Sequence, residues 1–91
     1  LRPRTYATLL GLLASTGLRI SEALRLTRSD FDDGRHLLAI RETKFHKSRL
    51  VPLHPSAALA LREYAAFRDQ VHLHPATDVF FITDRGTPLR Y

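Results

Sequence analysis

The sequence predicts an α+β fold that is mainly helical and carries a small three-stranded antiparallel sheet. Several segments have the apolar spacing of helices, and two apolar runs on either side of a short polar tip have the layout of a β-hairpin. Hydrophobic residues make up 44% of the chain and charged residues 25%, which is typical of a folded rather than a disordered chain. With 91 residues, the chain is expected to form one small domain.

The first predicted helix covers residues 5–15. Its side chains Tyr6, Leu9, Leu10 and Leu13 follow the i, i+3, i+4, i+7 spacing of one buried stripe. Gly17 is expected to end this helix, because glycine adopts a left-handed backbone without steric cost.

A second, short helix is predicted over residues 19–26, with Ile20, Ala23 and Leu24 facing inward. Its other face carries Arg19 and Glu22. These two side chains can touch, because residues three apart on a helix are neighbours on its surface.

Residues 30–34 have the composition of a turn. A strand over residues 36–42 and an antiparallel partner over residues 48–53 are predicted to follow, joined by a tip at residues 44–47. Pro52 cannot donate a hydrogen bond to a ladder, so the second strand is expected to have an open side there.

A third helix is predicted to begin at Pro55, since proline is favoured near the first helical position. Its expected buried stripe consists of Leu59, Leu61, Tyr64, Ala65 and Phe67. Residues 79–82 are expected to form the third strand, residues 84–86 a turn, and Thr87-Pro88 the start of another helix.

The positive charge is concentrated in one part of the chain. The net charge is +5, and all of the excess lies within residues 1–53, while residues 54–91 are balanced. This asymmetry points to a polyanion partner or to a solvated basic surface, and charge alone does not separate the two.

No metal or other cofactor is expected. The absence of cysteine excludes a disulfide framework and a thiolate metal site. His72 and His74 are close in sequence, but they lack the third ligand that a metal site requires.

Arg19 has the features of a phosphate-binding arginine. Its guanidinium is a planar fork that can pair with two phosphate oxygens, and the start of a helix adds amide donors and partial positive charge. Glu22 is expected to orient the guanidinium by accepting a hydrogen bond. An ordinary surface ion pair is the alternative that this neighbourhood leaves open.

Two longer motifs resemble the tyrosine recombinase (phage integrase) family. Residues 16–24 read T-G-L-R-I-S-E-A-L, and residues 43–53 read T-K-F-H-K-S-R-L-V-P-L. The family's first active-site arginine lies in T-G-x-R-x-S/T-E, which corresponds to Arg19, and its supporting acidic residue corresponds to Glu22. Its catalytic lysine lies in K-x-x-K-x-R-x-V-P-L, which corresponds to Lys44. Residues 80–89 also resemble the family's third strand and the turn after it.

The resemblance implies an enzyme that breaks and rejoins DNA through a 3′-phosphotyrosyl intermediate, without metal or cofactor. Arg19 and Lys44 would be catalytic, Glu22 would support them, and Lys47, Arg49 and Arg25 are expected to contact DNA. The implied partners are double-stranded DNA and further recombinase protomers, which form a tetramer on paired sites in this family. A cytoplasmic protein of bacterial, phage or mobile-element origin is expected.

The choice of general-acid lysine stays open between two positions. Phe45-His46 replaces the glycine or asparagine often found at the tip of this hairpin in the family, so a longer loop is expected. Lys44 and Lys47 could then exchange roles, although motif alignment favours Lys44. The alternative for both lysines is non-specific phosphate contact.

The family's second motif, H-x-x-R on a later helix, and its nucleophilic tyrosine have no expected counterpart. His46 and Arg49 have the H-x-x-R spacing, but they overlap the hairpin motif. Tyr6 and Tyr64 lie on apolar helical stripes, where a core position is the ordinary explanation, and Tyr91 directly follows the third strand.

Residues 1–91 are therefore expected to be a partial catalytic domain, inactive alone; the absence of methionine agrees with this. Other hypotheses are a non-catalytic DNA-binding module, either helix-turn-helix-like or a decayed integrase, and a small basic interaction domain. The start of the chain imitates a secretory signal, but it has helical patterning and no clean cleavage site. No segment is long enough to span a membrane.

Overall fold

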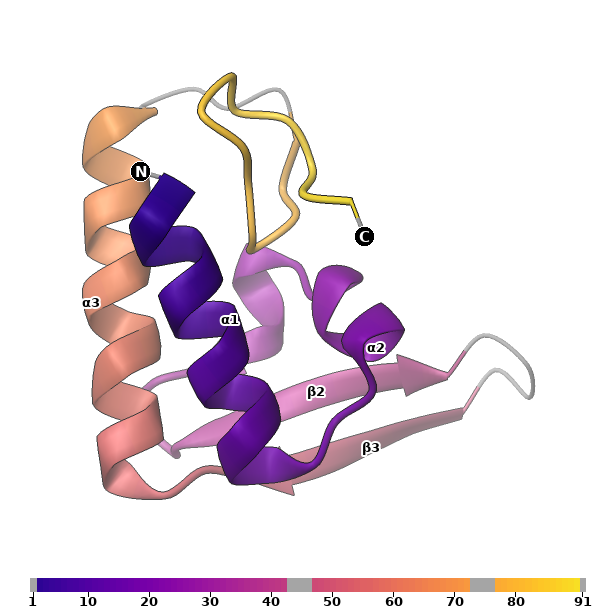
Figure 1. The fold of residues 1–91 in the computed structure, drawn as a ribbon. Helices are drawn as coiled ribbons and strands as arrows, with labels where there is room; N and C mark the ends of the chain where they lie inside the picture. The colour runs from indigo at the N-terminus through magenta and orange to yellow at the C-terminus, as the bar shows by residue number, and fades with distance from the viewer. Residues whose placement is uncertain (1, 43–46, 73–76, 91) are drawn as a thin grey trace.

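The structure, a computed structural model, describes residues 2–42, 47–72 and 77–90. Its elements are α1 (Arg2–Thr16), α2 (Ile20–Leu24), the 3-10 turn Arg28–Asp30, β1 (Phe31–Asp32), β2 (Leu37–Glu42), β3 (Lys47–Pro52) and α3 (Pro55–Val71). In Figure 1, α1 packs beside α3, the sheet runs across one end of this pair, and residues 77–90 cover the other end. The predicted α+β fold with a three-stranded antiparallel sheet is confirmed.

The buried face of α1 differs from the predicted stripe. Leu9 is buried as expected, but Leu12 and Thr5 share the core with it, whereas Tyr6 is 40% and Leu10 62% exposed. The Thr5 hydroxyl lies 2.9 Å from the Tyr64 hydroxyl and donates to the Ile82 carbonyl oxygen at 3.3 Å. These polar contacts compensate the burial of a threonine, and they turn the helix away from its more apolar stripe.

The sheet has the order β1-β2-β3, so its third strand is not the one that was predicted. Phe31 pairs with Leu38 in β1 and β2, and Leu38 pairs with Val51 in β3. The acidic turn expected at residues 30–34 thus contributes a two-residue strand. The hairpin of β2 and β3 has the predicted antiparallel pairing, and it ends at Leu37↔Pro52.

Residues 79–82 form single bridges instead of a strand, Thr27↔Val79 and Ile82↔Pro88. The guanidinium of Arg68, which is 3% exposed, donates to the Phe80 carbonyl at 3.0 Å and to the Val79 carbonyl at 2.9 Å. A buried side chain therefore satisfies the carbonyl groups that a neighbouring strand would otherwise bind. The predicted helix start at Thr87-Pro88 is wrong, because Thr87 lies in a bend after Gly86 (φ +75°) and Pro88 forms a bridge with Ile82.

The third helix begins at Pro55, as predicted, after His54 accepts the amide of Ser56. Most of its expected stripe is buried, but Leu59 is 44% exposed. Its buried side chains are Ala58, Leu61, Tyr64, Ala65 and Arg68.

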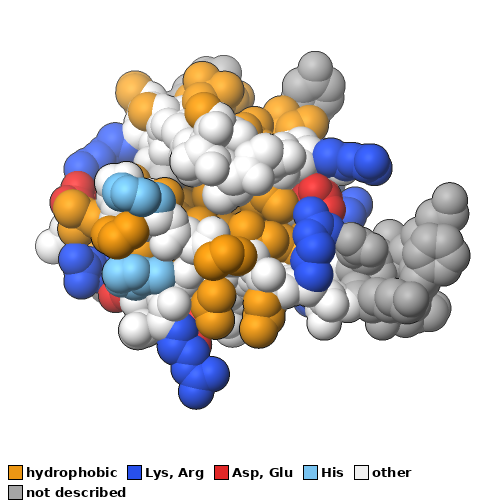
Figure 2. Space-filling view, turned by 90° about the horizontal axis from the view of Figure 1, so that it is seen from below, with side chains coloured by type: hydrophobic (Ala, Val, Ile, Leu, Met, Phe, Trp, Pro, Cys, Tyr) orange, Lys and Arg blue, Asp and Glu red, His pale blue; other side chains and the backbone are white. Residues whose placement is uncertain are grey.

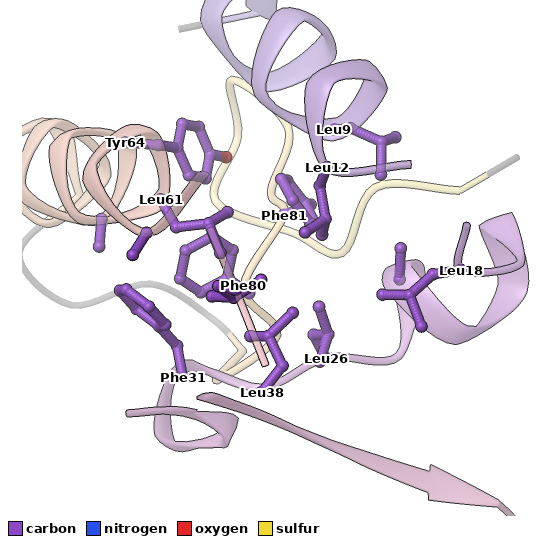
Figure 3. Close-up of a cluster of buried hydrophobic side chains, with 14 of the residues drawn as sticks. Leu9, Leu12, Leu18, Leu26, Phe31, Leu38, Leu61, Tyr64, Phe80 and Phe81 are labelled. Carbon is purple, nitrogen blue, oxygen red and sulfur yellow. The ribbon is translucent and has the colours of Figure 1, made fainter. Parts of the chain in front are cut away.

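The core joins all these elements around a group of aromatic rings. Figure 3 shows leucines of α1 and aromatic side chains of α3 and of the late segment turned toward one another. The Phe80 and Phe81 rings lie 5.1 Å apart with near-perpendicular planes, and Tyr64 is 5.5 Å from each. Phe31 of β1 meets the edge of Phe80 at 6.1 Å. The rings therefore connect α3, β1 and the late segment within one core.

Candidate functional site

Arg19 lies at the junction between α1 and α2. Gly17 has φ +72° and its amide donates to the Leu13 carbonyl at 3.0 Å, which confirms the predicted left-handed helix end. Leu18 then enters the core, and Ala23, inside α2, is completely buried. These two anchors leave Arg19 exposed in extended backbone directly before the helix.

Glu22 connects two parts of the site through its two carboxylate oxygens. Oε1 accepts the backbone amide of Arg19 at 2.9 Å, and Oε2 accepts Nη1 of Arg49 at 2.9 Å. The carboxylate thus binds the main chain of Arg19, whereas the sequence predicted a contact with its guanidinium. The Glu22 side chain is 11% exposed.

The ionised form of Glu22 is the one that this arrangement favours. The hydrogen bond from Arg49, followed by that from the Arg19 amide, holds the pKa of the Glu22 carboxyl below its usual range, although burial opposes them. Glu22 is therefore a carboxylate at neutral pH. One negative charge lies between two arginines, and the group keeps a net positive charge that suits an anion.

Arg49 brings the second motif to the first. It lies on β3 opposite Ile40 of β2, and its side chain is 43% exposed. Through its contact with Glu22, the strand that follows the hairpin tip is attached to the start of α2. The two motifs, far apart in sequence, are neighbours at this point.

Of the two candidate lysines, the structure describes only the backbone of Lys47. Lys44 lies outside the described residues. Lys47 begins β3 with its backbone paired to Glu42, but its side chain lies outside the described part of the structure. The preference for Lys44 remains a prediction.

A family model, the phage integrase family, matches residues 2–91. The chain belongs to this family. A Sinorhizobium fredii protein named as an integrase/recombinase (y4rE) is 49% identical over 89 residues, which cover 98% of this chain and 29% of that protein. Tyrosine recombinase XerC of Chlamydia caviae is 38% identical over 81 residues, which cover 89% of this chain and 26% of XerC.

Solved structures agree in fold. XerA recombinase matches with a TM-score of 0.84 and 25% identity, over 96% of this chain and 31% of that one. The Tn1549 transposon integrase, in complex with transposon right end DNA, matches with a TM-score of 0.71 and 22% identity, over 90% of this chain and 32% of that one. The chain thus spans less than a third of each of these relatives.

The described tyrosines of this phage integrase family member lie in different surroundings. Tyr64 is 1% exposed, and its hydroxyl accepts the Ile82 amide at 3.3 Å, which confirms a core position. The core position predicted for Tyr6 is wrong, because α1 turns Thr5 inward instead. Tyr91 lies outside the described residues.

The described part of the H-x-x-R spacing, residues 47–49, lies on strand β3. His46 lies outside the described residues, and Arg49 extends from a strand toward Glu22. This placement agrees with the interpretation that the spacing is coincidental.

A second link between hairpin and helix was not predicted. Nη2 of Arg41, on β2, donates to the Arg25 carbonyl at 3.2 Å and lies 3.2 Å from Oδ2 of Asp30. Arg25 itself is exposed at the end of α2. The sequence signals this link only by the position of Arg41 near the end of a strand. The contacts of Arg41 with Arg25 and Asp30 depend on the pairing register, which the sequence does not show.

The face of the hairpin opposite the Arg19, Glu22 and Arg49 group is exposed and largely apolar. The outward face of the hairpin carries apolar residues such as Leu50, which is 66% exposed. Figure 2 shows the molecule from below, with apolar side chains near the centre and basic, acidic and histidine side chains toward the borders. An open pocket of about 400 Å³ between α1 and residues 82–89 shares no lining residue with the Arg19, Glu22 and Arg49 group. Among the described residues, no cluster of three potential metal ligands occurs, and no helix is long and apolar enough to cross a membrane.

Proposed function

We propose that residues 1–91 are part of the catalytic domain of a site-specific recombinase that breaks and rejoins double-stranded DNA. Arg19 binds the scissile phosphate, and Lys44 acts as general acid. Lys47 and Arg25 contact neighbouring phosphates. The nucleophilic tyrosine and a second arginine belong to other parts of the recombinase, and several protomers act together on paired sites.

The residue types suit this chemistry. When a tyrosine hydroxyl attacks a phosphodiester, negative charge develops on the non-bridging oxygens, and a 5′-hydroxyl leaves as the 3′-phosphotyrosyl bond forms. A fixed guanidinium stabilises that charge, because its fork matches two phosphate oxygens. The leaving oxygen needs a proton, which a lysine on a hairpin that reaches the DNA can donate.

One observation carries the proposal: Glu22 joins the amide of Arg19 to Arg49 on the hairpin. This contact brings the arginine motif and the lysine motif to one place, as a shared phosphate site requires. The DNA in the structurally similar Tn1549 integrase supports the choice of partner.

A helix-turn-helix module is less well supported. The helix after the turn has five residues, about 7.5 Å at 1.5 Å per residue, and its fourth residue, Ala23, is fully buried. A recognition helix needs a longer exposed face to enter the major groove. No contact in the structure favours this second function.

The test uses the full-length recombinase that contains this chain and a nicked suicide substrate that traps covalent complexes. Arg19→Lys should keep DNA binding within about threefold, because the positive charge remains. Covalent complex should fall by about 10²–10³, the usual cost of losing one preorganised charge donor. Arg62→Lys is the control, because Arg62 is an exposed arginine of α3 in a long 3.8 Å ion pair with Asp33. Normal covalent complex in Arg19→Lys would refute the assignment.

A further inference from the structure

The contact between Arg49 and Glu22 separates two possible roles for Arg49. An arginine on the hairpin could bind a DNA phosphate, which is the role that the sequence predicted for Arg49. In the structure, however, its Nη1 lies 2.9 Å from a carboxylate oxygen of Glu22, in a charge-assisted hydrogen bond. Glu22 in turn binds the backbone amide of Arg19.

We propose that Arg49 is a positioning residue, which holds Glu22 so that Glu22 fixes the backbone of Arg19. The inference rests on the proposed function, since it assigns a role within that same site. Arg49 acts on catalysis through Glu22, and it contributes little to DNA affinity.

The division of the Glu22 oxygens supports this chain of contacts. Each oxygen has a different partner, so rotation of the carboxylate would break both bonds. The Glu22 side chain is 11% exposed and the Arg49 side chain 43% exposed, so Glu22 is the more shielded partner of this pair. The hairpin strand and the start of α2 are held in one relative position by this pair.

Charge explains why the arrangement needs Arg49. Without Arg49, Oε2 of Glu22 loses its partner, and the carboxylate can rotate away from the Arg19 amide. It can then approach the Arg19 guanidinium and compete with a phosphate for it. With Arg49 present, the carboxylate is occupied and the Arg19 guanidinium remains available to an anion.

The experiment is a double-mutant cycle in the full-length recombinase, with single-turnover cleavage of a suicide substrate as the readout. Arg49→Ala and Glu22→Gln should each lower the cleavage rate about tenfold. If Arg49 acts through Glu22, the double variant should be no slower than the slower single variant. Rate losses that multiply would overturn the proposal.

DNA binding at several salt concentrations provides the second readout. Arg49→Ala should leave the dissociation constant within twofold and the salt slope unchanged. Arg25→Ala, which removes a proposed phosphate contact from the same region, should lower the slope by about 0.9. A slope reduced by that amount in Arg49→Ala would make Arg49 a phosphate contact and refute the positioning role.

Two controls keep the outcomes distinct. If Arg19→Ala cleaves normally, the proposed function fails; if it is inactive while Arg49→Ala cleaves normally, only the role of Arg49 fails. Should Arg49→Ala lose its fold by circular dichroism, Arg49→Met, which keeps an unbranched apolar stem, replaces it under the same two criteria.

Discussion

Replacing Arg68 with methionine should loosen the late segment of the chain. Arg68 is 3% exposed, and its guanidinium donates to the carbonyl groups of Val79 and Phe80 and, at 2.6 Å, to Oδ1 of Asp69. Arg68→Met keeps an unbranched apolar stem but leaves both carbonyl groups without these donors. Residues 78–82 should then open more often than the rest of the core.

The size of the effect follows from these contacts. A hydrogen bond to a charged group contributes about 1.5–3 kcal/mol. Two such bonds to backbone carbonyls are lost, and the lower bound of about 3 kcal/mol applies because burying the guanidinium itself costs desolvation energy. The ion pair with Asp69 contributes little to this free energy, because the Asp69 side chain is 46% exposed. About 3 kcal/mol corresponds to a change of about 100-fold in an opening equilibrium.

Native-state hydrogen exchange in the full-length recombinase measures this opening directly. The amides of Phe80, bonded to the Leu26 carbonyl, and Leu89, bonded to the Phe81 carbonyl, are the probes. Both should lose about 100-fold protection in Arg68→Met. Arg62→Met, an exposed arginine on the same helix, should change them by less than threefold. If protection of Phe80 falls less than threefold in Arg68→Met, the guanidinium does not hold this segment and the reasoning is wrong.

Two further predictions concern the site and the backbone. Arg49→Ala should raise the pKa of the Glu22 carboxyl toward 4.5, because the Arg49 hydrogen bond is the main cause of its lowering. In the native protein, this carboxylate stabilises the fold above about pH 4.5, and that stabilisation is lost as the pH falls through the lowered pKa. Carbon-detected NMR titration of Glu22 checks this, and an unchanged pKa in the variant would contradict it. Gly86→Ala should lower Tm and cost about 1–2 kcal/mol, because Gly86 has φ +75° and a Cβ there would lie 3.2 Å from Nδ1 of His72. Gly11→Ala, in open space on α1, should instead raise Tm, with a gain of up to about 1 kcal/mol in the free energy of unfolding. Equal Tm shifts in the two variants would exclude the positive φ of Gly86 as the cause.

The helices and the hairpin were predictable because their signals are local. Pro55, the apolar spacing of α3 and the apolar runs of β2 and β3 each depend on residues within a few turns or along one strand. The end of α1 at Gly17 follows from the same local chemistry, since a left-handed residue closes a helix without a distant partner.

The predictions were wrong where the local sequence was compatible with more than one structure. The first helix offers two overlapping apolar stripes, and buried hydrogen bonds of Thr5 with Tyr64 and Ile82 select the less apolar one. Residues 79–82 have the composition of a strand, but Arg68 takes the hydrogen bonds that would have attached them to the sheet. Both outcomes depend on side chains from other elements.

The same distinction applies to the site. Sequence alone determined the family to which Arg19 and Lys44 point, because motif spacing along the chain carries that information. It also determined that Glu22 lies one turn after Arg19. Only the tertiary structure decided that Glu22 binds the Arg19 backbone and the Arg49 guanidinium, since that contact joins residues 27 positions apart. Nη1 of Arg49 and Oε2 of Glu22 come within 2.9 Å because β2 and β3 pair in this register and because Ala23 anchors α2 in the core. Neither the register nor the burial of Ala23 is encoded in a single local segment.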